Sequence, residues 1–229
     1  MKISFLSMEK WKRLKIQETI MKKLGLILLL PLAATIFSCK DDADEGIIVQ
    51  DHDKNEFMTI MHNMNSKMHS MQMTGDADHD FANMMVIHHQ GAIDMANKEL
   101  EKGNDATIKS MAQQIIDKQT AEKTELTAWL QSHTPISNAE GQEFHMEMTE
   151  VMEKMENWKD IQVLTGDADN DFAQLMIVHH QTATDNAQSI LHHGHHDDIK
   201  EMAKMMIEDQ NKEITDLTAW LKANGPTNH

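Results

Sequence analysis

The chain of 229 residues has little of several residue types that common protein classes require. It contains one cysteine, no tyrosine and three prolines, and aromatic residues make up 4% of it. A single thiol excludes an internal disulfide and a multi-cysteine metal cluster. Little β-branched alternation leaves no signal for strands. The one long apolar run, at 24–37, is too short to span a membrane comfortably.

This apolar run belongs to a segment laid out like an export signal. Met21 is followed by two lysines, then by the run, Ser38 and Cys39. The arrangement resembles a bacterial lipoprotein signal, in which the cysteine is lipidated after cleavage. We therefore expect a signal region at 1–38 with its true start at Met21, a lipid anchor on Cys39 and an acidic flexible tether at 39–53. These features predict a cell-envelope protein outside the cytoplasm, facing the periplasm or the surface; the alternative is an uncleaved anchor helix.

Acidic residues dominate the chain beyond the signal region. Seven of the 21 Lys and Arg and two of the 37 Asp and Glu precede Cys39, which leaves a net charge near −21 for the remainder. Such a charge argues against binding nucleic acid or an anionic membrane surface through protein charge. All 15 histidines and 18 of the 21 methionines lie in this acidic part.

An internal repeat organises this part of the chain. Residues 75–130 and 166–221 align without gaps at an offset of 91, with 29 of 56 positions identical. Each copy has an Asp-rich start, helical spacing of apolar residues and a central glycine, and so predicts a helical hairpin. Amphipathic stretches at 57–71 and 144–158 precede the hairpins. We expect one all-α domain at 54–229, with repeats at about 75–131 and 166–223. The two hairpins would form a four-helix bundle, with an extra Met-rich helix before each.

The first repeat carries a motif that spans both predicted helices. On the first helix are Phe81, Met85, His88, His89, Gln90 and Met95, and on the second are Gln119, Glu122 and Trp129. The second repeat departs from it at Thr182 and Asn186. This pattern resembles a bacterial secreted family, the domain of unknown function 305, known for paired histidines and two-helix repeats. The resemblance implies a ferritin-like fold. Some cyanobacterial relatives are periplasmic copper-binding proteins, so it also implies copper.

The residues themselves support a soft metal. Adjacent helical histidines point about 100° apart, and Met85 lies three residues before His88, so sulfur and imidazole can share a face. Thioether and imidazole suit Cu(I), and less well Cu(II) or zinc. The candidate ligands are Met85, His88, His89, Met176, His179 and His180. In a hairpin turning near 102–103, Gln119 and Glu122 lie within about one turn of His88. We expect these two, and their copies Gln210 and Glu213, to orient the imidazoles.

Several other positions are weaker candidates: Met61, His62, Met95, Met111 and Met202. The Met-rich stretch at 58–71 also has the spacing of a core face. Hairpin geometry puts Met111 about two turns from His88, so neither Met111 nor its copy Met202 is expected to share a metal ion with the histidines. The histidines of 192–196, at the second hairpin turn, would hold zinc, nickel or Cu(II) only loosely.

Two familiar metal motifs fail. The Asp76-x-Asp78-x-Asp80 sequence lacks the glycine and glutamate of a calcium loop, which favours helix capping. Met85 and Met176 stand where a ferritin-type di-iron motif requires glutamate, so di-iron chemistry is not expected.

The sequence favours a metal-binding protein over an enzyme, one that captures or buffers copper, or confers resistance, outside the cytoplasm. Zinc, or no metal, is the alternative. Two other classes stay open. One is a structural or signalling lipoprotein with no metal, whose histidines are core or pH-sensitive groups; the other is a metal-dependent redox enzyme. The expected partners are a metal ion and, through lipidated Cys39, a membrane. A second copy of the chain or a metal-handover partner stays open, and nucleic acid is not expected.

Overall fold

The structure, a computed structural model, describes residues 49–225. Within that range it has no strand, and its elements are η1 (His52–Lys54), α2 (Glu56–His69), α3 (Ala77–Lys102), α4 (Ala106–Ser132), α5 (Ala139–Asp160), α6 (Ala168–His193) and α7 (Asp197–Asn224). The predicted all-helical fold is confirmed. The predicted signal region, Cys39 and the first part of the tether lie outside the described residues. No helix between residues 49 and 225 is long and apolar enough to cross a membrane.

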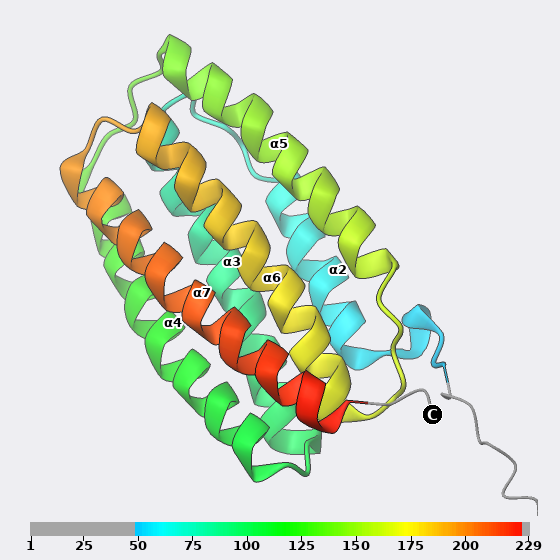
Figure 1. The fold of residues 1–229 in the computed structure, drawn as a ribbon. Coiled ribbons are helices and arrows are strands. Elements are labelled where there is room, and N and C mark those ends of the chain that lie inside the picture. Colours follow the sequence, from blue (N-terminus) through cyan, green and yellow to red (C-terminus); the bar gives the residue numbers. More distant parts are fainter. Residues whose placement is uncertain (1–48, 226–229) are drawn as a thin grey trace, which may run out of the picture. The chain divides into compact units, whose positions relative to one another are not determined.

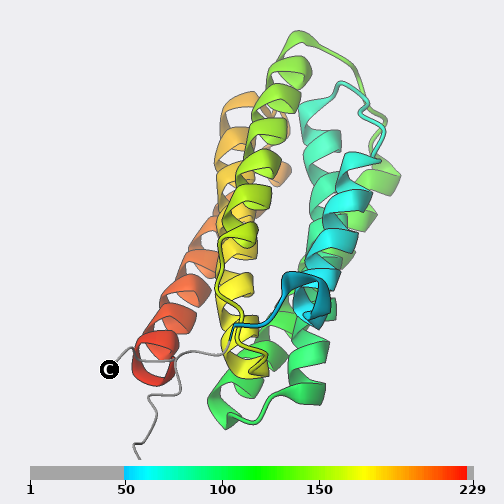
Figure 2. The same ribbon diagram turned by 90° about the vertical axis from the view of Figure 1, so that its right-hand side faces the viewer.

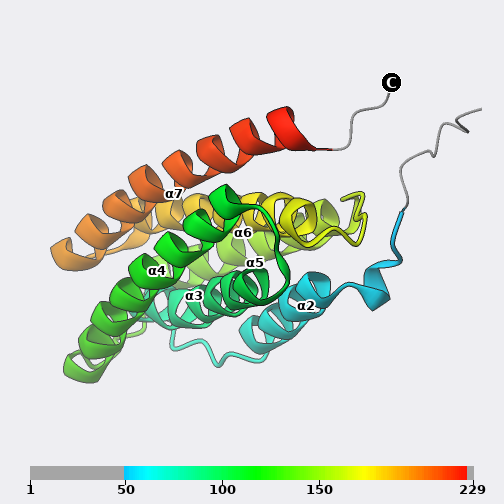
Figure 3. The ribbon, with the colours of Figure 1, turned by 90° about the horizontal axis from the view of Figure 1, so that it is seen from below.

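Helices α3 and α6 occupy the centre of the bundle and pack against each other. Each pairs with the helix that follows it, giving the α3–α4 and α6–α7 hairpins (Figure 1). Viewed from below, α4 and α7 lie on one side of the central pair and α2 and α5 on the other (Figure 3). Figure 2 shows α2 and α5 covering that second side. The two hairpins and the two preceding helices therefore form the arrangement expected from the repeat, and a specifically ferritin-like relationship stays a prediction.

Aspartates fix the start of α3 and the turn before it. The Asp76 carboxylate accepts a hydrogen bond from the backbone N–H of His79 and caps the helix. Asp80 reaches back to accept from the N–H groups of Thr74 and Gly75. Gly75 has a φ of 80°, a conformation that favours glycine. The Asp-rich segment therefore closes a turn and starts a helix, as its sequence suggested.

The middle aspartate of each repeat crosses to the other repeat. Asp78 accepts hydrogen bonds from the backbone N–H groups of residues 195–196, just before α7. Asp169 accepts in the same way from residues 104–105, just before α4. A Cβ on Gly194 would lie 2.5 Å from the Asp78 Oδ1, so glycine lets the carboxylate approach. Because the N-terminus of each central helix meets the C-terminal end of the other, α3 and α6 run antiparallel about a pseudo-two-fold axis.

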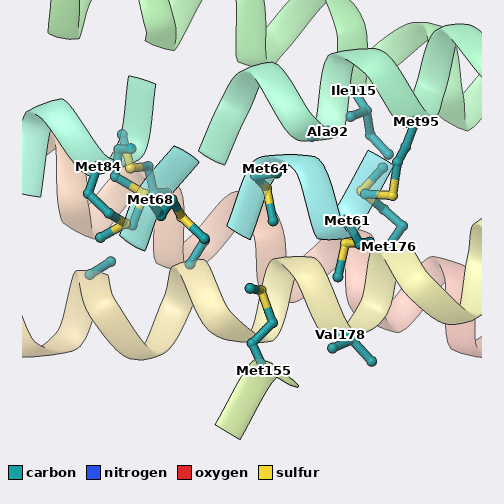
Figure 4. Close-up of a cluster of buried hydrophobic side chains, with 14 of the residues drawn as sticks. Met61, Met64, Met68, Met84, Ala92, Met95, Ile115, Met155, Met176 and Val178 are labelled. Atoms are coloured by element: carbon teal, nitrogen blue, oxygen red, sulfur yellow. The ribbon is translucent and has the colours of Figure 1, made fainter. Parts of the chain in front are cut away.

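Methionine fills the core between α2 and the central helices. Met61, Met64 and Met68 are buried on one face of α2, and Figure 4 shows them directed toward methionines of the other helices. Met64 lies against Gly91, where an added Cβ would clash with its sulfur. His62, in contrast, is exposed. The Met-rich stripe therefore faces the core and packs there, while this histidine faces solvent.

The last residues of the predicted tether bond to the helical domain. The backbone N–H of Gln50 donates to the Leu164 carbonyl at 2.7 Å, and His52 Nε2 lies 2.9 Å from the Gln162 carbonyl oxygen. Asn55 then caps α2 by accepting from the N–H of Met58. Residues 50–55 thus contact the helical domain, and the boundary at 54 stays a prediction.

Candidate functional site

The candidate site is a polar layer across the middle of the bundle, which we call the histidine layer. It comprises both histidine pairs and four polar residues of the flanking helices: His88, His89, His179, His180, Gln119, Glu122, Gln210 and Glu213. The four imidazoles are fully buried and the two glutamines nearly so. The pairs lie on α3 and α6, and the other residues lie on α4 and α7. Helix periodicity produces the layer, because the first histidine of each pair faces the other central helix and the second faces its hairpin partner.

His88 and His179 meet where α3 and α6 cross. Their ring centroids are 3.6 Å apart, with the planes tilted by 39°. His179 Nε2 lies 3.0 Å from the backbone carbonyl oxygen of His88, and a carbonyl only accepts, so Nε2 carries the hydrogen. His179 Nδ1 consequently holds a lone pair, and it has no hydrogen-bond partner in the protein; neither nitrogen of His88 has one. Two buried lone pairs therefore lie close together at this crossing.

Both rings at the crossing are held neutral. Burial lowers the pKa of His88 and of His179 well below the usual histidine value, and repulsion from neighbouring imidazoles adds to the effect. Neutral imidazole is the form that binds a metal ion. The crossing therefore has the correct protonation state for a ligand at neutral pH.

The second histidine of each pair contacts a glutamate across its hairpin. His89 Nε2 lies 2.7 Å from a Glu122 carboxylate oxygen, and His180 Nε2 lies 2.9 Å from one of Glu213. Burial by itself would raise the pKa of Glu213, but its contacts with His180 and Lys118 outweigh that effect and lower the pKa. A carboxylate on one ring nitrogen fixes the imidazole orientation and leaves the other nitrogen as a potential ligand. Both ring nitrogens of His89 and of His180 are buried and neither makes an aligned hydrogen bond in the protein, so the Nε2–carboxylate contact is close in distance alone and Nδ1 has no partner.

Gln119 and Gln210 add further unpaired groups to the histidine layer. The amide nitrogen and oxygen of each are buried and have no hydrogen-bond partner in the protein. A buried polar group without a partner destabilises a fold by about 1–3 kcal/mol. A layer containing several of them is a poor solution for packing alone, and such groups in native proteins cluster at functional sites.

Thioethers lie beside this layer on the α2 side. Figure 4 shows the side chains of Met61, Met95 and Met176, from α2, α3 and α6, gathered at one place, and all three are buried. We call them the methionine cluster. Met176 lies one helical turn before His179 and Met95 lies two turns after His88, so the cluster extends from the crossing along the central helices. Two of its members, Met61 and Met95, are weaker candidates in the sequence, and the structure places their side chains beside that of Met176.

The repeat offset maps the methionine cluster onto a second set of residues with a different composition. Met61 corresponds to Met152, Met176 to Met85, and Met95 to Asn186. All three counterparts are buried. The Asn186 amide donates to the Thr182 carbonyl at 3.0 Å, and its Oδ1 has no partner. One half of the molecule thus offers three thioethers where the other offers two and an amide.

A groove of about 370 Å³ between α4 and α7 reaches toward the histidine layer. Met111, Lys118 and Glu213 are among its lining residues. The Glu213 side chain is 15% exposed and contacts fully buried His180, so it joins the groove to the core. Met111, demoted as a partner of the histidines, lies in the groove wall, and its copy Met202 is partly buried.

No group of three or more His, Cys, Asp or Glu side chains between residues 49 and 225 is arranged to hold a metal ion.

Comparison with known families shows which family the chain belongs to. The model of the family described as "Domain of unknown function (DUF305)" matches residues 6–130 and 78–221. The chain belongs to the DUF305 family. The resemblance seen in the paired-histidine motif is confirmed, and the two overlapping matches follow the internal repeat. No curated protein matches the chain.

Solved structures include similar DUF305 proteins. A putative secreted DUF305 protein from Streptomyces coelicolor has 22% identity and a TM-score of 0.53, covering 68% of this chain and 98% of its own. A DUF305 fragment from Deinococcus radiodurans has 23% identity and a TM-score of 0.49, covering 65% and 97%. CopM in the Cu(I)-bound form has 26% identity and a TM-score of 0.49, covering 64% and 96%. The Streptomyces structure supports the helical fold.

Proposed function

We propose that this protein captures and buffers copper outside the cytoplasm, holding Cu(I) between thioether and imidazole ligands in the core of the bundle. The observation that carries the proposal is the set of buried imidazole nitrogens without protein partners at the crossing of α3 and α6. A soft ion would satisfy these nitrogens and remove their desolvation penalty.

The ligand types in the core favour Cu(I) over harder ions. The methionine cluster supplies three uncharged sulfurs, and the histidine layer supplies neutral imidazoles. Thioethers bind Cu(I) well and bind Mg²⁺ or Ca²⁺ poorly. Glu122 and Glu213 stay at the rim, where they orient His89 and His180.

The proposed route inward is the groove between α4 and α7. Its Met111 thioether is a first contact for a soft ion, and the Glu213 carboxylate, which contacts Lys118 and His180, links the groove to the histidine layer. The acidic surface raises the local cation concentration. We further propose that Cys39 carries the lipid anchor and holds the domain at the cell envelope, where a partner protein or a second copy of the chain receives the ion.

The test is an anaerobic titration of the purified protein with Cu(I) in competition with bicinchoninate. We expect wild type to withhold at least one equivalent of Cu(I). Replacing His88 and His179 by asparagine should weaken binding at least tenfold, because the paired lone pairs at the crossing are lost. Exposed His62 and His69 provide the matched control: their asparagine variants should bind as wild type does.

X-ray absorption on the Cu(I)-loaded wild type gives a readout that does not depend on variants folding. We expect both sulfur and nitrogen in the first coordination shell. Absence of Cu(I) retention, or a shell of nitrogen and oxygen only, contradicts the proposal and favours a lipoprotein whose histidines serve the core.

A further inference from the structure

A cluster of aromatic rings lies at the end of the bundle where α4 finishes and α7 begins, away from the central layer. The buried Trp129 indole stacks on His133, with centroids 4.1 Å apart and planes within 10°. His196 stands edge-on to both rings, 5.2 Å from Trp129 and 4.9 Å from His133. His133 follows the last residue of α4, and His196 is the N-cap of α7. Two histidines 63 residues apart in sequence thus share one corner.

Each of these imidazoles has a nitrogen available to a ligand. His133 Nδ1 lies 2.9 Å from the Trp129 carbonyl oxygen, which only accepts, so Nδ1 carries the hydrogen and Nε2 holds the lone pair. Metal-binding histidines commonly donate one ring N–H to a backbone carbonyl in this way. His196 occupies a capping position, yet its side chain makes no capping hydrogen bond. The His196 ring is exposed, and capping does not occupy its nitrogens.

The ring separation fits two imidazoles bound to one ion. With a metal–nitrogen bond of about 2.0 Å, each ring centre lies about 3 Å from the metal. Two such rings at a right or tetrahedral angle have centres about 4.5–5 Å apart by the same geometry. The observed 4.9 Å between His133 and His196 falls in this range. The carboxylate of Asp198, which accepts from the Trp129 indole N–H at 2.9 Å, adds negative charge at the same corner.

The opposite end of the bundle is a natural control. There Trp220 takes the place of Trp129, Asn224 that of His133, and Asp105 that of His196. Asn224 donates to the Trp220 carbonyl at 3.0 Å, the same backbone role that His133 has. Asp105 caps α4 by accepting from two backbone N–H groups, and it also accepts from the Trp220 indole at 3.1 Å. The tryptophan end at Trp220 therefore forms without histidine. His196 makes no side-chain cap for α7, whereas its counterpart Asp105 caps α4.

We propose that His133 and His196 form a second metal site, which binds a borderline divalent cation, Cu(II) first, against the wall of Trp129. Two imidazoles are borderline ligands that suit Cu(II), nickel and zinc, and Cu(II) binds such a set most tightly. The remaining coordination positions open to solvent, which suits rapid loading and release. The site shares no residue with the core site proposed above, so either can exist without the other.

Trp129 fluorescence provides the test. Phenylalanine replaces Trp11, Trp158 and Trp220 in the full chain, which leaves Trp129 as the only indole, and Cu(II) is titrated at micromolar concentration. We expect quenching of more than half, complete near one equivalent, because bound Cu(II) lies close to the indole. His133→Asn and His196→Asp, the residues of the opposite end, should each shift the midpoint at least tenfold upward.

The matched control is the double variant His192→Asn/His195→Asn, which removes neighbouring exposed imidazoles and should quench as the parent does. Nitrogen hyperfine structure in the electron paramagnetic resonance spectrum should indicate two imidazoles, and fewer in either single variant. Equal midpoints in parent, His133→Asn and His196→Asp would overturn the proposal, as would loss of quenching in the control. Cu(I) retention by His133→Asn should equal that of the parent, which separates this result from the core proposal.

Discussion

The two repeats share one backbone plan and one histidine pair each, and they differ at several other positions that could bind a metal ion. The Asp-rich turns, the hairpin glycines, the histidine pairs and the tryptophans recur in both copies. The differences include one position of the methionine cluster, two positions at the tryptophan ends and one buried carboxyl. The repeated residues are those that build the fold in both copies. A residue present in only one copy is therefore not needed for the fold, which makes it a candidate for a function.

The largest effect should come from making the methionine cluster resemble its counterpart. Met95→Asn replaces a buried thioether with the amide found at position 186. We expect at least tenfold weaker Cu(I) retention and a loss of stability of about 2–4 kcal/mol, because a sulfur ligand is removed and the buried amide oxygen would lack a partner, as that of Asn186 does. Chelator competition and urea unfolding measure the two effects. Met84→Leu, which copies Leu175, is the control and should change stability by less than about 1.5 kcal/mol.

The reciprocal change sharpens the comparison. Asn186→Met supplies a third thioether beside Met85 and Met152, and it removes a buried amide oxygen without a partner. We expect it to raise Cu(I) stoichiometry by up to one equivalent without weakening the original site. Unchanged stoichiometry in a folded variant would show that three buried sulfurs alone do not make a site.

An intermediate effect should come from Glu99, whose counterpart is Ile190. Glu99 is fully buried, and burial together with a side-chain contact to the Asp169 carboxylate raises its pKa to about 9. A carboxyl with a pKa higher in the folded than in the unfolded state favours folding at low pH, and this contribution is lost as pH rises from about 4.5 to about 9. Glu99→Ile should therefore gain about 1–3 kcal/mol at pH 8.

Urea unfolding at several pH values measures this effect. The parent should lose stability across that window, and Glu99→Ile should lose less. Glu101→Ile, two residues away and exposed, is the control and should keep the slope of the parent. Parallel pH profiles for parent and Glu99→Ile would mean that Glu99 ionises in the folded protein without penalty.

The smallest effect concerns the N-terminus of α7. His196→Asp restores the capping residue present at Asp105, and we expect about 1 kcal/mol of added stability without metal. Thermal unfolding with and without Cu(II) measures it. The parent should gain stability from Cu(II) and the variant should not, so the order of the two reverses when the metal is added.

Much of the fold follows from sequence because its signals are local or repeated. Helical spacing, glycine stops and the 91-residue offset predict the hairpins. In a helical hairpin, residues equally far before and after the turn lie side by side, which predicts that Glu122 lies near the histidines. It is found 2.7 Å from His89. These inferences require only helix geometry and one turn, so no long-range information is needed.

The site is less accessible to such reasoning. Methionine spacing on α2 fits core packing and ligation equally, so it cannot show that Met61 joins Met95 and Met176. The crossing of Asp78 to the other repeat is a long-range contact without a sequence signal. His133 and His196 did carry a signal, because each replaces an asparagine or aspartate of the other copy. Comparing the repeats where they disagree would have found them.

The reciprocal bonds of Asp78 and Asp169 have an evolutionary consequence. Each repeat supplies the carboxylate that the backbone of the other requires, so the two hairpins relate to each other as subunits of a two-fold dimer do. A chain with one hairpin could satisfy these bonds only by joining a twin. Within one polypeptide the two halves need not be identical, and the methionine cluster and the His133–His196 corner each occur once rather than twice.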